Sequence, residues 1–169
     1  MRVLAAVALA ILAVAPAAAA PAAPAVRVPL LKGGEIFDSR ALIGKKVFVL
    51  RFQASWCTAC AAQAAGVERV YERYRSRGVE VLAIHMDDTE RDARAFLETH
   101  RARYPAALDP SVRLANRFGV KRAPYTVVVN KRGEIAARLD AATDEAHLAA
   151  AIDAALKLPA RRRAPRRAS

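Results

Sequence analysis

Cysteine is scarce in this sequence: the 169 residues include only two, Cys57 and Cys60. A disulfide that closes so small a loop removes little entropy from the unfolded chain, so the pair is a poor structural staple. Two thiols are also too few for a zinc site built from cysteine alone, and no histidine pair with ligand spacing follows them. The remaining interpretation is a reactive dithiol, which we expect to work in an oxidising compartment.

Long hydrophobic runs are missing too. The apolar run over residues 3–14 is too short for a helix that spans a bilayer. Arg2 precedes this run, and small residues follow it, with Ala17 and Ala19 matching the A-x-A cleavage rule. We therefore predict a signal peptide over residues 1–20 and an exported protein, periplasmic or otherwise extracytoplasmic. An uncleaved membrane anchor is the alternative.

Acidic residues are outnumbered: 16 Asp and Glu stand against 28 Lys and Arg, for a net charge of +12. Five of the arginines lie in residues 161–167, within a segment, 159–169, that we expect to be a basic disordered tail. Docking of this tail to anionic lipid or to an acidic partner is the alternative. No nucleic-acid-binding motif accompanies the charge, so we expect no nucleic-acid partner.

The rest of the chain alternates strands with helices. Residues 21–27 are predicted to be a Pro/Ala-rich linker, and residues 28–158 a single domain. The patterns predict, in order, a hairpin around Gly33-Gly34, a strand at 47–52, a helix at 57–77, a strand at 79–86, a helix at 88–103, a short strand at 106–108, a short helix at 111–118, strands at 125–129 and 135–139, and a helix that Thr143 caps and that runs to about 158. This order predicts an α/β fold with a mixed central sheet and helices on both faces.

The two cysteines stand where the first long strand passes into a helix, in the run Trp56-Cys57-Thr58-Ala59-Cys60. A helix N-terminus offers unpaired N–H groups and a positive dipole end, which stabilise a thiolate. We therefore expect Cys57 to be the exposed nucleophile, and Cys60, one turn deeper, to resolve the mixed disulfide. Metal binding by the pair is the alternative.

This junction resembles the F-W-A-x-W-C-x-x-C core of the TlpA/ResA-like exported thioredoxin family. The matching run is Phe52-Gln53-Ala54-Ser55-Trp56-Cys57-Thr58-Ala59-Cys60. The resemblance extends over residues 28–158. It implies a thioredoxin fold with an N-terminal hairpin and an inserted helix after the second strand of the βαβ unit. It also implies a redox-active disulfide between Cys57 and Cys60, without a cofactor or a metal.

The resemblance further implies a substrate-binding surface beside the cysteines. A cis peptide at Ala123-Pro124 is expected to face them and to offer its backbone to an extended client chain. Trp56 is expected to pack there and to contact the substrate. The implied partners are exported proteins that carry thiols or disulfides, together with a membrane-bound or soluble thiol electron donor. We expect a monomer, and cytochrome c biogenesis is one role that the family suggests.

Three positions depart from the family pattern. Arg51 stands where a small polar or acidic residue is usual, Gln63 where Glu is often found, and Gln53 where Trp is usual. Both usual proton acceptors for the buried thiol are therefore missing. Arg51 is expected either to lie near the cysteines and favour a thiolate, or to pair with a carboxylate such as Asp87 or reach solvent.

These features predict a protein thiol–disulfide oxidoreductase. The resemblance favours a reductase, whereas Arg51 favours a thiol oxidase or isomerase of more oxidising potential. A copper chaperone that uses His85 and Met86 is a weaker alternative, because adjacent strand residues point to opposite faces. A peroxidase is disfavoured, because Thr58 lies between the cysteines and not ahead of them.

Overall fold

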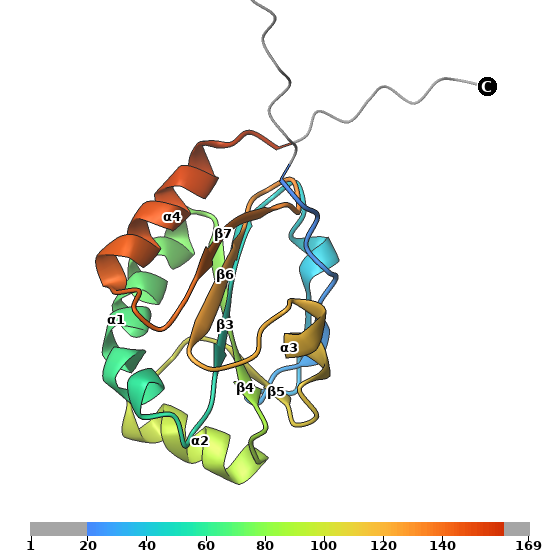
Figure 1. Ribbon diagram of the computed structural model, residues 1–169. Helices are drawn as coiled ribbons and strands as arrows, with labels where there is room; N and C mark the ends of the chain where they lie inside the picture. The colour runs from blue at the N-terminus through green and yellow to red at the C-terminus, as the bar shows by residue number, and fades with distance from the viewer. Residues whose placement is uncertain (1–19, 161–169) are drawn as a thin grey trace, which may run out of the picture.

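The computed structural model describes residues 20–160 (Figure 1). The predicted signal peptide, up to residue 19, and the arginines of the predicted tail lie outside the described residues. Within the described part of the chain, no helix is both long enough and apolar enough to cross a membrane.

A five-stranded mixed sheet forms the centre of the molecule, with the strand order β5-β4-β3-β6-β7. The central strand, β3, pairs in parallel with β4 and antiparallel with β6, while β5 joins β4 in parallel and β7 joins β6 antiparallel. The predicted mixed α/β sheet is confirmed. The strand bounds are β3 (Val47–Gln53), β4 (Val79–Met86), β5 (Ala106–Asp109), β6 (Tyr125–Val129) and β7 (Ile135–Leu139).

Helices cover both faces of the sheet, as Figure 1 shows. One face carries α1 (Thr58–Tyr74), α2 (Glu90–Thr99) and α4 (Glu145–Lys157). The other face carries the short α3 (Arg113–Arg117), a 3-10 helix (Ser39–Ala41) and the predicted N-terminal hairpin, formed by β1 (Arg27–Pro29) and β2 (Ile36–Asp38). The inserted helix after the second strand of the βαβ unit is α2, so this feature of the thioredoxin fold is present.

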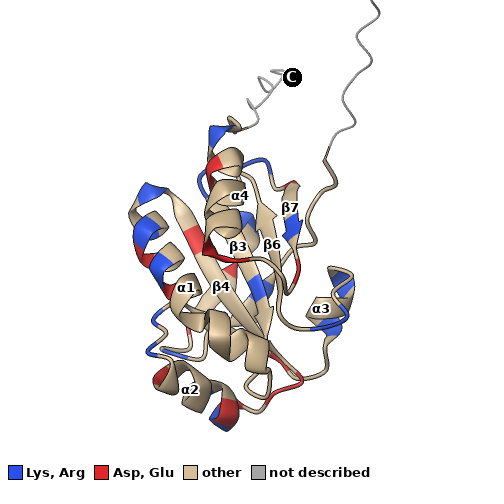
Figure 2. Ribbon diagram, turned by 60° about the vertical axis from the view of Figure 1, so that its left-hand side comes forward, with Lys and Arg blue, Asp and Glu red and all other residues tan. Residues whose placement is uncertain are grey.

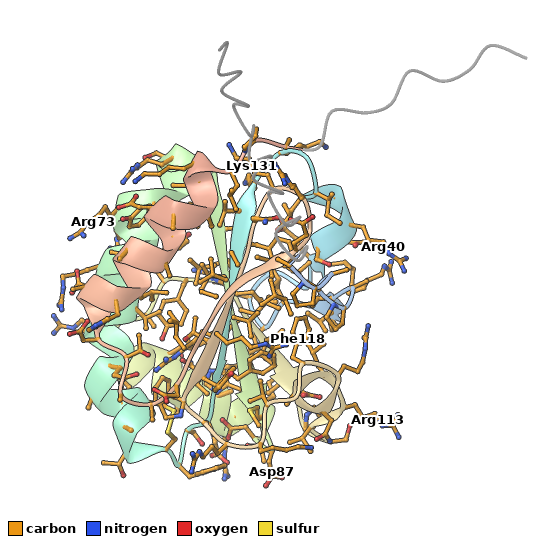
Figure 3. All side chains as sticks on the ribbon, turned by 45° about the horizontal axis from the view of Figure 1, so that its top comes forward. Arg40, Arg73, Asp87, Arg113, Phe118 and Lys131 are labelled. Atoms are coloured by element: carbon orange, nitrogen blue, oxygen red, sulfur yellow. A yellow bond between two sulfur atoms is a disulfide. The ribbon has the colours of Figure 1, made fainter. Side chains whose placement is uncertain are left out.

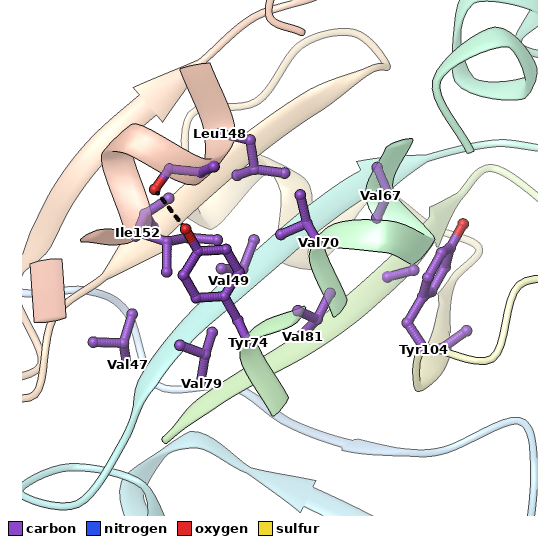
Figure 4. Close-up of a cluster of buried hydrophobic side chains, with 14 of the residues drawn as sticks. Val47, Val49, Val67, Val70, Tyr74, Val79, Val81, Tyr104, Leu148 and Ile152 are labelled. Carbon is purple, nitrogen blue, oxygen red and sulfur yellow. Dashed lines mark hydrogen bonds between the residues drawn. The ribbon is translucent and has the colours of Figure 1, made fainter. Parts of the chain in front are cut away.

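The alternation of β3 explains why two cores form. Val47 and Val49 face the α1 and α4 side, where they pack with Tyr74 and other apolar side chains (Figure 4). Phe48 and Phe52 face the opposite cluster. All seven residues of β3 are buried, as expected of a central strand with both faces covered.

Charged residues decorate the outer surface of the helices (Figure 2). Ion pairs join α1 to α4 there: Arg69 lies 2.8 Å and Arg73 3.3 Å from carboxylate oxygens of Glu145. Exposed pairs of this kind each contribute little to stability. The apolar side chains of the first core, from both helices, are what hold α1 and α4 side by side.

Residues 21–27, predicted to be a linker, instead pack on the domain. The Ala23 N–H donates to the Gly133 carbonyl at 2.8 Å, and the Ile135 N–H donates to the Pro21 carbonyl at 2.8 Å. Val26 is fully buried among the apolar side chains of the second core. The Pro/Ala composition did not predict this packing. The backbone of the segment bonds to the chain at the start of β7, and its one valine is part of the second core.

The four α-helices begin one or two residues later than predicted, and the caps of α4 and α2 show why. Asp144, not Thr143, caps α4, because its carboxylate accepts from the His147 N–H at 2.9 Å. Thr89 caps α2, which leaves Asp88 outside the helix. Asp88 turns instead toward the chain that precedes the cysteines, and this places it in the site described next.

Candidate active site

The loop after β3 delivers Cys57 to the start of α1. Cys57 is the N-cap residue, with φ −88° and ψ 104°, and its Sγ accepts from the Cys60 N–H at 3.1 Å. A disulfide joins the two cysteines, whose Cα atoms are 5.2 Å apart. Because Cys57 is the N-cap, its Sγ already occupies the position where a helix N-terminus stabilises a thiolate. Asp87 lies at the same end of the molecule (Figure 3).

The two cysteines differ in accessibility. Cys57 is 7% exposed and Cys60 1% exposed. Cys57 is thus the more accessible sulfur, although in the disulfide it is far less exposed than we expected. Ala54, Ala64 and Phe96 pack around the pair and account for this burial.

The expected substrate-binding residues gather beside the disulfide. Ala123 precedes Pro124 through a cis peptide bond, and Ala123 packs against the cluster that contains the cysteines. The Trp56 side chain is 63% exposed, and its Nε1–H donates to the Asp87 carbonyl at 3.3 Å. Trp56 is therefore less a packing residue than an exposed apolar surface held in place at one edge.

Arg51 is buried, with only 3% of its surface exposed, so it does not reach solvent. Its Nη1 donates to Thr126 Oγ1 at 3.1 Å and its Nη2 to Gln63 Oε1 at 2.6 Å. Among the described residues no carboxylate acts as a partner of Arg51, and the expected alternative partner Asp87 is exposed. Its buried Nε also lacks a partner within that part of the chain.

Burial without a counter-charge has a clear electrostatic effect. It lowers the pKa of Arg51 from its usual value to about 10. Two of the three departures from the family pattern, Arg51 and Gln63, thus meet in one hydrogen bond. Gln63 lies one turn after Cys60 on α1, and its Nε2 donates to the Ala141 carbonyl at 2.8 Å. The guanidinium is therefore fixed by neutral groups, close to the helix turn that carries Cys60.

The structure also contains a cluster of hydrogen-bonded polar side chains that was not predicted from the sequence. It comprises Ser55, Asp88, His85 and Gln53, which are linked in that order by hydrogen bonds. Burial lowers the pKa of His85, and Asp88 opposes this only in part. The only local signal was an acidic residue just after an apolar strand, which is also a common helix cap.

Metal ligation finds no support in these positions. His85 faces α2, where its ring meets Phe96 at 5.5 Å, whereas Met86 belongs to the core on the opposite face. Across residues 20–160, no group of three or more His, Cys, Asp and Glu side chains is arranged to hold a metal ion.

Residues 19–138 match the sequence model described as the AhpC/TSA family. The chain belongs to this family. This AhpC/TSA member is 29% identical over 102 residues to the "Thiol-disulfide oxidoreductase ResA" of Halalkalibacterium halodurans, covering 60% of this chain and 57% of that protein. It is 31% identical over 107 residues to the ResA of Geobacillus kaustophilus, covering 62% of this chain and 59% of that protein. The chain thus spans less than two thirds of the length of these relatives.

Solved structures resemble this AhpC/TSA member over more of its length. A putative thiol:disulfide interchange protein DsbE from Chlorobium tepidum superposes with a TM-score of 0.73 at 27% identity, covering 81% of this chain and 96% of that one. A putative protein disulfide isomerase from Bacteroides thetaiotaomicron gives a TM-score of 0.75 at 23% identity, covering 82% and 90%. The thioredoxin fold and the TlpA/ResA-like resemblance inferred from the sequence are confirmed.

Proposed function

We propose that the chain exchanges thiols and disulfides with exported client proteins through Cys57 and Cys60, and that it acts as a reductase. The observation that carries the proposal is the disulfide at the start of α1, where Cys57 Sγ already accepts the Cys60 N–H. The relatives named thiol-disulfide oxidoreductase support it.

The chemistry needs only the two sulfurs. The Cys57 thiolate attacks one sulfur of a client disulfide, and the other client sulfur leaves as a thiolate. Cys60, deprotonated, then attacks Cys57 Sγ in the mixed disulfide and releases the second client thiol. The client gains two electrons and two protons overall, and the chain is left with the Cys57–Cys60 disulfide. A thiol electron donor restores the dithiol by the reverse exchange.

Arg51 supports a second candidate, a thiol oxidase or isomerase. A buried cation without a carboxylate partner favours the thiolate, and a stabilised thiolate makes the couple more oxidising. A copper-binding chaperone has no comparable support. The direction of electron flow therefore depends on how strongly Arg51 acts on the sulfurs.

We place this activity outside the cytoplasm, after removal of a signal peptide at residues 1–20. The apolar run with its A-x-A site supports this. One structural neighbour is described as a secreted Mycobacterium tuberculosis disulfide oxidoreductase. Apocytochrome c is one client whose thiols such a reductase would maintain.

The proposal predicts that the reduced protein turns over insulin disulfides when dithiothreitol supplies electrons. Turbidity from the released insulin chain measures the rate, and equilibration with glutathione mixtures measures the potential. A potential close to that of the reducing thioredoxins, about −270 mV, would support the reductase, and one near about −120 mV the oxidase. Without insulin turnover in either direction, the proposal fails.

We also propose that the basic tail is dispensable for this chemistry. Pro159 still belongs to the domain, because Arg132 Nε donates to its carbonyl at 2.9 Å. A chain that ends at Ala160 should therefore keep its melting temperature within about 2 °C and its insulin turnover rate. A loss of several degrees would mean that the tail is docked. Co-sedimentation of the full chain and of the chain that ends at Ala160 with phosphatidylglycerol vesicles then tests whether the tail contacts anionic membranes.

A further inference from the structure

The turn after β4 holds the loop that carries Cys57. Asp88 Oδ2 accepts from the Ser55 backbone N–H at 2.8 Å, and Asp88 Oδ1 accepts from Ser55 Oγ at 2.6 Å. The neighbouring residues are also joined: Trp56 Nε1, just after Ser55, donates to the carbonyl of Asp87, just before Asp88. The Asp88 side chain is 2% exposed, so a buried carboxylate is bonded to the loop that carries Cys57. Hydrogen bonds to a charged partner are about twice as strong as neutral ones.

His85 is the other hydrogen-bond partner of the Asp88 carboxylate. His85 Nδ1 lies 2.8 Å from Asp88 Oδ2, and His85 Nε2 lies 2.9 Å from Gln53 Nε2. Because the amide nitrogen of Gln53 donates, His85 Nε2 is the acceptor and Nδ1 carries the proton. Asp88 Oδ2 therefore receives donors from both Ser55 and His85, and the ring is neutral.

The surroundings of His85 keep this arrangement fixed. The ring is fully buried, with Gln53 on the neighbouring strand β3 and the edge of Phe96 on α2. Gln53 also acts on Tyr104: burial raises the pKa of Tyr104 to about 12, an effect that Gln53 and Arg51 partly offset. Asp88 is thus the carboxylate in direct contact with the ring.

The anchored loop determines how Cys57 meets its helix. The Cys57 N–H donates to the Ala54 carbonyl at 3.2 Å, which closes the turn over residues 54–57. Ser55 lies inside this turn, so its two bonds to Asp88 fix the turn relative to β4. This turn also sets the extended φ and ψ of Cys57, which direct its Sγ toward the N–H groups at the start of α1.

We propose that Asp88 and His85 are positioning residues for the exchange reaction: they hold Ser55, and through it the N-cap geometry that stabilises the Cys57 thiolate. The proposal rests on the proposed function in that Cys57 is taken as the nucleophile. It explains why an imidazole and a carboxylate occupy a core face that apolar side chains could fill at lower cost.

Two variants that change no charge near neutral pH test the proposal. Ser55→Ala removes the hydroxyl, and His85→Leu removes the donor that supports Asp88. Both should loosen the turn and raise the pKa of Cys57, so that iodoacetamide alkylates the reduced protein about three- to tenfold more slowly near pH 6.5. His85→Asn should restore much of the rate, because its Nδ2–H can donate to Asp88.

Asp87→Asn is the matched control. Asp87 is exposed and has φ 47°, a conformation that Asn also adopts readily, so this variant should react at the parent rate. If Ser55→Ala and His85→Leu are both alkylated at the parent rate with their folds intact, the positioning role is wrong. It is also wrong if Asp88→Asn speeds alkylation while Ser55→Ala changes nothing, since that pattern means that only the charge of Asp88 acts. Alkylation needs no client, so these outcomes remain readable even if insulin is not turned over.

Discussion

Cys57→Ser is expected to lower insulin turnover by about three orders of magnitude or more, because a hydroxyl cannot replace the thiolate nucleophile. Cys57 is the more accessible sulfur and the N-cap residue of α1, whereas Cys60 is enclosed one turn deeper. The variant should therefore trap almost no mixed disulfide with clients. Turbidity and non-reducing electrophoresis measure the two effects.

Cys60→Ser is the matched comparison. Its Cys57 thiolate can still attack, but the intramolecular resolving thiol is missing, so the reaction should stop at a mixed disulfide. Brief alkylation of the reduced parent near neutral pH should label Cys57 first. Preferential labelling of Cys60, or equal trapping by the two variants, would contradict the assignment of the nucleophile.

Arg51→Met is expected to stabilise the fold. Burial lowers the pKa of Arg51 to about 10, well below that of an exposed arginine. The charged guanidinium therefore destabilises the folded state at every pH below about 10, and this penalty is relieved as the pH rises above about 10 toward the higher pKa of arginine in the unfolded chain. Since apolar side chains often replace buried charges favourably, the free energy of unfolding should rise by about 1 to 3 kcal/mol near pH 7. Urea titration measures it.

The same substitution should shift the redox couple. Arg51 is bonded to Gln63, one turn after Cys60 on α1, so its loss removes a cation that is held by the helix carrying the cysteines. The pKa of the nucleophilic thiol should rise, and the potential should become more negative by about 30 mV for each 1.4 kcal/mol of lost thiolate stabilisation. Arg51→Asn should shift both quantities in the same direction.

Arg69→Met is the control for Arg51→Met. It removes the same charge from the outer surface of α1, where Arg69 pairs with Glu145, and should leave the potential unchanged. If Arg51→Met equilibrates with glutathione like the parent, Arg51 has no influence on the sulfurs. The reductase would then be favoured over the oxidase.

Local patterns predicted the framework of the fold well. The bounds of β4, β6 and β7 agree with the prediction, because each is an apolar run between turn residues. The beginnings of helices were less predictable. Thr143 and Asp144 are adjacent and can both cap a helix, and only the packed position of α4 decides between them.

In the candidate site, too, local patterns predicted some positions, whereas contacts between distant segments decided the others. The positions of Cys57 and Cys60 followed from a motif at a strand–helix junction, which is a local signal. The alternation of β3 placed Arg51 on the α1 face, but its partners Thr126 and Gln63 come from other elements. The bonds of Asp88 to Ser55 span 33 positions, and nothing local distinguishes that carboxylate from a helix cap.

The strand order has a consequence for incomplete chains. One edge of β3 pairs with β4, and the other pairs with β6 (Tyr125–Val129), which is synthesised much later. Until then an apolar strand presents unpaired backbone groups, which act as a template for aggregation. A polypeptide that terminates before Tyr125 contains the complete pair of cysteines, yet it lacks the strand that closes the sheet. We therefore expect such truncated products to aggregate and not to act as small redox proteins.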